Sequence, residues 1–242
     1  MAHLTRAEWE ESDDPDGMLL AQGLNRHARK IRLLLVAHCR HIWDRLSDPS
    51  RETVAVAERF AEGKANQHEL AAACHRAQGV WLSCDAHNRE LASKLEDTLE
   101  TVWEGANSDS LHAIREQFNS VTLQTAAASL AVEVARPDYK TWAPQFPTTL
   151  PESDRVWASQ LIRELFGNPF HPIAFDPKWR TDTVALLAEG MYESRDFSAM
   201  PILADALQDA GCENDEILHH CRNPKQVHVR GCWLVDRILD NE

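Results

Sequence analysis

The residues best suited to chemistry gather near the end of the chain, between Gly211 and Asp236. This segment holds three of the six cysteines and three of the twelve histidines. Thiolate and imidazole are preferred ligands of zinc, which takes four ligands in a tetrahedral arrangement. The candidate ligands are Cys212, Cys221, His228 and Cys232. One hypothesis is therefore a metal-binding or metal-dependent protein with a zinc-type site in this segment.

The spacing of these four residues favours a different interpretation. The pattern C-x8-C-x6-H-x3-C lacks the close pair of ligands that zinc knuckles have. Cys221 shares an apolar helical face with Ile217 and Leu218, and Cys232 stands next to Trp233. Because a buried thiol behaves as a small hydrophobic group, both cysteines also suit a helical core. Apart from zinc, the sequence predicts no cofactor.

Two further histidines give a second metal hypothesis. His38 and His41 lie three residues apart on a helix predicted over residues 25–46, so that both could reach one ion. Two ligands are only part of a site. The alternative is a partly buried pair whose ring nitrogens are hydrogen-bonded within the protein.

Basic side chains suggest a binding surface in the same terminal segment. They are Arg222, Lys225, His228 and Arg230. Free backbone N–H groups at the start of the last predicted helix favour an anion beside them. The anion could be a carboxylate of a partner or of the acidic stretch from Glu8 to Asp16, which carries six carboxylates.

A proline-rich loop at 167–179, GNPFHPIAFDPKW, supplies the remaining binding candidates. Its three prolines and three aromatic residues restrict its conformation, as either a recognition loop or a loop that seals the core requires. The candidates in it are Asn168, Phe170, His171 and Trp179. We expect the turn from Arg222 to Arg230 to face this loop.

Motifs that define a reaction are missing from the sequence. There is no G-x-S-x-G elbow, no phosphate-binding glycine loop, no G-x-G-x-x-G and no EF-hand pattern. His68 and Glu69 begin an H-E-x-x-H pattern, but Ala72 stands where the second histidine would be needed. These observations favour a non-enzymatic role.

The composition narrows the partners and the compartment. A formal net charge of −13 disfavours binding to a phosphate backbone, so we expect no nucleic acid. The most apolar stretch, Ile31 to Ala37, contains Arg32 and is too short to cross a membrane. No C-x-x-C pair occurs among the cysteines. We expect a cytoplasmic protein with reduced thiols and no membrane contact; the oligomeric state stays open.

The hydrophobic pattern predicts an all-α fold in two parts. Apolar residues alternate three and four positions apart from Leu70 to Val102 and again from Leu111 to Val132, which predicts a long antiparallel hairpin over about 67–135. An N-terminal bundle would cover 1–135 and a proline-rich strap 136–151, followed by a C-terminal set of short helices over 152–242. Expected caps and stops are Gly63, Gly167, Thr181, Gly211 and Asn214.

Several motifs resemble a family of uncharacterised bacterial proteins. They are FGNPFHP, DPKW, PILADALQDAGC and HVRGCWLVD in the second half, and TRAEW, DDPDGML and IRLLLVAHCRHIW near the start. The resemblance covers about residues 4–62 and 163–242. It implies no activity, cofactor or catalytic residue.

Together these features favour a non-enzymatic helical module that binds a protein or peptide. The alternatives are a zinc-type metal protein and a helical protein that binds a small ligand. The metal-protein alternative would use either the terminal segment or the His38/His41 helix.

Overall fold

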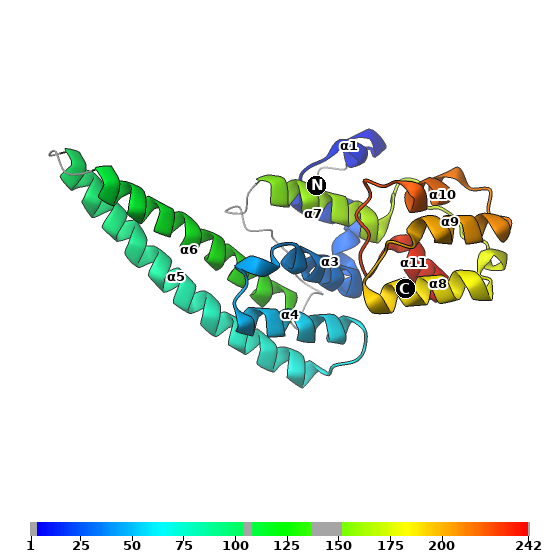
Figure 1. The fold of residues 1–242 in the computed structure, drawn as a ribbon, viewed down its shortest axis with the longest axis horizontal. Helices are drawn as coiled ribbons and strands as arrows, with labels where there is room; N and C mark the ends of the chain where they lie inside the picture. Colours follow the sequence, from blue (N-terminus) through cyan, green and yellow to red (C-terminus); the bar gives the residue numbers. More distant parts are fainter. Residues whose placement is uncertain (1–3, 104–107, 137–151, 242) are drawn as a thin grey trace. The chain divides into compact units, whose positions relative to one another are not determined.

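The computed structural model describes residues 4–103, 108–136 and 152–241. In these ranges every regular element is a helix, which confirms the all-α class (Figure 1). The chain divides into two compact units. Met1–Leu24 and Val156–Glu242 form one, here called the terminal unit, and Asn25–Arg155 form the other, here called the middle unit.

This division differs from the expected one at the start of the chain. Residues 1–24 belong with the C-terminal helices and not with a bundle over 1–135. The reason is long-range: Trp9 is buried, and the Arg163 guanidinium donates hydrogen bonds to the backbone carbonyls of Trp9 and Ser12. The strap expected at 136–151 lies, except for Arg136, outside the described residues.

Four α-helices form the middle unit. They are α3 (Ala28–His41), α4 (Asp48–Ala61), α5 (Gln67–Trp103) and α6 (Ser108–Val134). A short 3-10 helix, η2 (Trp43–Arg45), follows α3, and the Ser47 side chain caps α4. Helices α5 and α6 lie side by side (Figure 1). Residues 104–107, where the expected turn falls, lie outside the described part of the chain.

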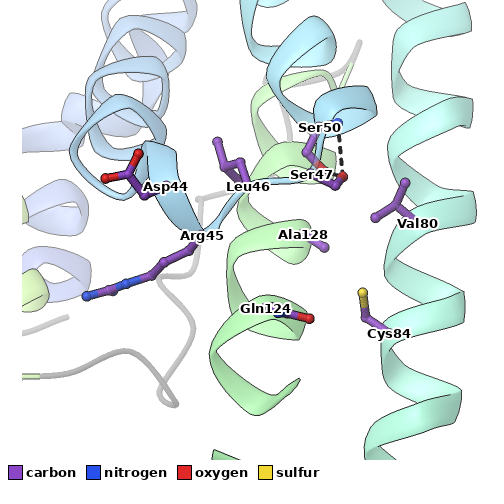
Figure 2. A pocket seen from close by; sticks show the side chains of 9 residues that line it. All are labelled: Asp44, Arg45, Leu46, Ser47, Ser50, Val80, Cys84, Gln124 and Ala128. Carbon is purple, nitrogen blue, oxygen red and sulfur yellow. Dashed lines mark hydrogen bonds between the residues drawn. The ribbon is translucent and has the colours of Figure 1, made fainter. Parts of the chain in front are cut away.

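Part of the apolar pattern predicted along α5 is buried in the structure. Leu70, Ala77 and Leu91 are buried. The Thr122 hydroxyl is 3.1 Å from the Asn88 side-chain oxygen. Cys84 is only partly buried and lines a small cavity of about 230 Å³. In Figure 2, Val80 and Cys84 of α5 face Gln124 and Ala128 of α6 across it.

A buried arginine joins α3 to the end of α6. Arg32 is 3% exposed, and its guanidinium donates to the backbone oxygens of Val134 and Arg136. The same group lies over the Phe60 ring, 4.9 Å from its centroid. Carbonyls at the end of a helix lack intrahelical partners, so Arg32 supplies the donors that α6 needs there.

Replacing Arg32 by methionine should therefore destabilise the protein. The carbonyls of the buried Val134 and the exposed Arg136 would lose their donor, which should lower the free energy of unfolding by about 2–3 kcal/mol. Urea unfolding measures this change. The matched control is Arg59→Met, because Arg59 pairs with Glu69 at the surface and an exposed pair contributes little. Equal losses in both variants would contradict the role given to Arg32.

The terminal unit contains shorter helices. They are α1 (Arg6–Glu11), α2 (Pro15–Leu20), α7 (Glu152–Phe166), α8 (Asp182–Ser194), α9 (Met200–Asp209), α10 (Asp215–Arg222) and α11 (Trp233–Leu239). The first turn of α7 counts with the middle unit. The core of the terminal unit lies between α8, α9, α10 and α11. None of the described helices has the length and apolar character needed to cross a bilayer.

Local signals set the ends of these helices as expected. The side chains of Thr181 and Asn214 accept hydrogen bonds from the first turns of α8 and α10. Gly167 ends α7 with φ +67°, and a Cβ atom there would lie 3.3 Å from the Trp233 ring. This position needs glycine for both its conformation and its space.

Candidate metal centre

Four potential metal ligands converge in the terminal unit. Glu164 lies on α7, His220 on α10, His228 in the segment after α10, and Cys232 directly before α11. One ligand atom from each lies within 4.8 Å of the others. In the described part of the chain this is the one group of three or more such side chains gathered closely enough to hold an ion.

The distances within the group fit a tetrahedral ion. Nε2 of His220 is 3.3 Å from Sγ of Cys232 and 3.6 Å from Oε2 of Glu164. Nδ1 of His228 is 3.1 Å from Oε1 of Glu164. In a tetrahedral zinc site, bonds of about 2.0–2.3 Å place neighbouring ligand atoms about 3.3–3.8 Å apart. Three of the pair distances are thus near the spacing that one zinc ion requires, and the remaining pairs lie within 4.8 Å.

Local structure explains how each side chain reaches the centre. Glu164 follows Leu161 on the buried stripe of α7, so its carboxylate points into the unit. His220 lies on the last turn of α10. Gly231, with φ +89°, turns the chain directly before Cys232, the N-cap residue of α11. The four side chains therefore come from α7, from the end of α10, from the segment after it and from the start of α11.

The centre is buried and electrostatically unusual. The side chains of Glu164 and Cys232 are inaccessible, and those of His220 and His228 are 10% and 8% exposed. Burial raises the pKa of Cys232 well above its usual value, and Glu164 raises it further. Burial lowers the pKa of His220, although Glu164 opposes this effect. With no cation present, the structure therefore favours a protonated thiol and a neutral imidazole.

One polar atom in the centre lacks a partner. Nε2 of His228 is buried and has no hydrogen-bond partner among the described residues. Leaving such a group unsatisfied is unfavourable, typically by about 1–3 kcal/mol. The Glu164 carboxylate, by contrast, also accepts a hydrogen bond from the Gln226 side-chain amide, at 3.1 Å. A cation bound beside Glu164 would compensate the carboxylate charge; bound through Nδ1 of His228, it would leave Nε2 of that ring without a partner.

The arrangement does not resemble a cysteine–histidine–glutamate catalytic triad. In a triad the acid orients one ring nitrogen while the nucleophile contacts the other. Here Cys232 and Glu164 both approach Nε2 of His220. Cys232 and Glu164 therefore lie on the same side of the His220 ring, as ligands of a common ion would. Cys232 also has neither the exposure nor the lowered pKa of a reactive thiol.

Two of the four zinc ligands expected from the sequence lie in this cluster. His228 and Cys232 belong to the centre, whereas Cys212 and Cys221 do not. These two thiols are buried in the apolar core of the terminal unit. Burial raises the pKa of Cys221 to about 12, with a contribution from Glu164. The apolar face of α10 buries Cys221 in the core, but it leaves His220 in the cluster of potential ligands.

Glu164 and His220 are the members of the cluster that the sequence interpretation missed. Glu164 lies three residues after Leu161 and seven after Trp157, so a carboxylate on an apolar helical stripe was a readable signal. His220 precedes Cys221 in the sequence and lies at the edge of the apolar face that contains Cys221. The spacing H-x7-H-x3-C of His220, His228 and Cys232 is the sequence signal for this cluster, and it does not include Cys212 or Cys221.

The second metal hypothesis gains no support from the structure. His38 is buried in the middle of the core of the middle unit, and Nε2 of the half-exposed His41 lies 3.7 Å from Oδ1 of Asp154. Arg45 also pairs with Asp154, so that this carboxylate is engaged by a guanidinium. His38 and His41 form part of no metal-ligating group within the described residues.

Burial of His38 should instead make stability depend on pH. Burial lowers the pKa of His38 to about 4; Asp154 opposes this, and His41 and Arg45 add to it. Since an unfolded histidine has a pKa of about 6.5, the unfolded chain takes up the proton first as the pH falls. The neutral His38 therefore contributes about 3 kcal/mol to the free energy of unfolding. This contribution is complete above pH ~6.5 and is lost as the pH falls towards ~4.

A His38→Gln variant tests this dependence, because glutamine takes up no proton. We expect the wild-type protein to lose about 3 kcal/mol more than the variant between pH 7 and pH 4. Urea unfolding at pH 7, 5.5 and 4 gives both curves. Parallel pH profiles for the two proteins would show that His38 is protonated equally in the folded and unfolded states.

The two arginines of the terminal segment contact other residues of the terminal unit. Arg222 contacts Asp205 at 2.7 Å. Arg230 donates to the backbone oxygens of Tyr192, at 2.6 Å, and Glu193, at 3.0 Å. Lys225 is exposed. The acidic stretch at 8–16 is contacted through its backbone by another arginine, Arg163.

The loop at 167–179 faces the terminal turn, as expected. Asn168 of the loop and Asn223 and Gln226 of the turn line one cleft of about 370 Å³. His220 and Trp233 also line it, so the cleft adjoins the metal centre.

The other loop candidates lie around this cleft or elsewhere in the unit. Phe170 packs edge-on against Trp9, with ring centroids 6.4 Å apart, and Trp179 packs in the same way against Phe175. The exposed His171 lies 3.4 Å from Glu216. Phe170 and Trp179 thus fit the loop-sealing alternative.

Comparisons with known proteins identify no relative of the chain. No protein-family model, curated protein or solved structure matches the chain.

Proposed function

We propose that the protein binds a zinc-type metal ion through Glu164, His220, His228 and Cys232. The observation that carries this proposal is the convergence of four ligand atoms within 4.8 Å in a buried place. A buried carboxylate beside a thiol and two imidazoles is unfavourable unless its charge is compensated. A divalent cation supplies that compensation and also converts the thiol to its ligating thiolate.

The donor set selects the class of metal. One sulfur and two imidazole nitrogens suit zinc and its borderline neighbours, such as Co²⁺. Magnesium and calcium prefer six or more oxygen ligands, of which the centre offers too few. Gln226 holds Glu164 from outside, as the second layer of residues in metal sites does.

Metal content and affinity test the proposal directly. We expect protein purified without a histidine tag to bind one zinc ion per chain in a competition with a chromogenic chelator. Glu164→Gln, His220→Gln and Cys232→Ser should each weaken binding at least about a hundredfold, and Gln226→Ala about tenfold. Elemental analysis gives the stoichiometry.

One histidine and one cysteine outside the ligand set provide controls. His219→Gln changes an exposed histidine next to His220, and Cys84→Ser changes a thiol of the middle unit. Both should keep wild-type affinity. Substoichiometric zinc in the wild-type protein, or equal losses in the control and ligand variants, would refute the proposal.

A second candidate function is binding of a protein or peptide at the adjoining cleft. Its volume of about 370 Å³ suits one or two side chains of a partner, and amide side chains stand beside the Trp233 ring. Such a mixture of apolar and hydrogen-bonding groups is usual in recognition sites. This function is compatible with a metal ion in the neighbouring centre.

Filling the cleft tests the second candidate. Glu216 lines the cleft and is exposed on the first turn of α10, so Glu216→Trp should block the cleft with little effect on the melting temperature. Crosslinking from cell extract should return a partner with the wild-type protein and lose it with the variant. The same set of proteins from both would count against the cleft as a binding site.

A further inference from the structure

We infer that the metal centre is closed: all four coordination positions belong to the protein, and the ion fastens the segment from Asn223 to Cys232 onto α7. This inference rests on the proposed function and concerns what the ion does. Structural zinc sites have four protein ligands, whereas catalytic sites have three and leave one position for water or substrate. The number and burial of the ligands decide between these two classes.

The ligands enclose the centre on several sides. Glu164 and Cys232 are inaccessible to solvent. The Trp233 ring lies against the His220 ring, with centroids 5.0 Å apart, and the Phe197 ring lies 6.4 Å from that of His228. The neighbouring cleft is lined by one of the four ligands, His220. Four potential ligands within 4.8 Å of one another and this cover leave no position for an outside molecule.

The contacts of the segment show what the ion would hold. Asn223–Cys232 contains no helix or strand. Gln226 and His228 both bind the Glu164 carboxylate, at 3.1 Å each, across more than 60 residues of sequence. Arg230 ties the segment to the end of α8 through backbone carbonyls. One carboxylate of α7 therefore anchors most of an irregular segment, and an ion bound to it would strengthen that anchor.

Cobalt-substituted protein tests the closure. Tetrahedral Co²⁺ with a thiolate ligand gives intense visible bands and a sulfur-to-metal charge-transfer band. We expect this spectrum to stay unchanged when azide or imidazole is added to the wild-type protein. Glu164→Ala frees one position, so its cobalt spectrum should respond to azide and show that the assay detects an open site. A saturable shift in the wild-type spectrum would overturn the inference.

The cobalt experiment tests the closed centre separately from the proposed metal binding. If no cobalt or zinc binds, the proposed metal function fails. If the metal binds and the wild-type spectrum responds to azide, the proposed function stands and the closed centre fails.

Hydrogen exchange tests the fastening role without any variant. At zinc a hundred times above its dissociation constant, amide exchange through opening of the segment 223–232 should slow by about a hundredfold relative to metal-free protein. Amides of α3 and α4, in the middle unit, serve as the internal control and should exchange equally in both forms. Unchanged exchange in 223–232 with bound zinc would overturn the fastening role.

Discussion

A carboxylate buried on an apolar helix is the constraint on which the terminal unit depends. Glu164 lies between the buried residues Leu161 and Leu165, where a charge is costly unless other groups compensate it. The side chains of His220, Gln226 and His228 are drawn to it from α10 and from the segment that follows. The path of the chain after α10 is therefore set by the need to satisfy one side chain of α7.

Elements set by local rules could be predicted from the sequence. The three-and-four spacing found the long helices, because a buried stripe repeats with the helical period. Thr181 and Asn214 cap the helices that their types suggested, and Gly63, Gly167 and Gly211 adopt the positive φ angles of helix ends. Asn168 and Gln226 also lie at one cleft, as the pattern of loop and turn indicated.

Pairings distant in sequence could not be predicted. Nothing near Glu164 indicates that its partners lie about 60 residues later, and nothing near Trp9 indicates that Arg163 binds its carbonyl oxygen. The candidate metal ligands show the same limit. Residue type identified His228 and Cys232, but only the packing of α7 against the terminal segment separates them from the core thiols Cys212 and Cys221.

The most direct test of this account is zinc-edge X-ray absorption of the zinc-loaded protein, because it counts ligands by element. The structure predicts one sulfur at about 2.3 Å and three nitrogen or oxygen neighbours at about 2.0–2.2 Å. Three sulfur neighbours would instead mean that Cys212 and Cys221 bind the ion. A shell of six light atoms would mean that no such centre forms, and either result would contradict the arrangement around Glu164.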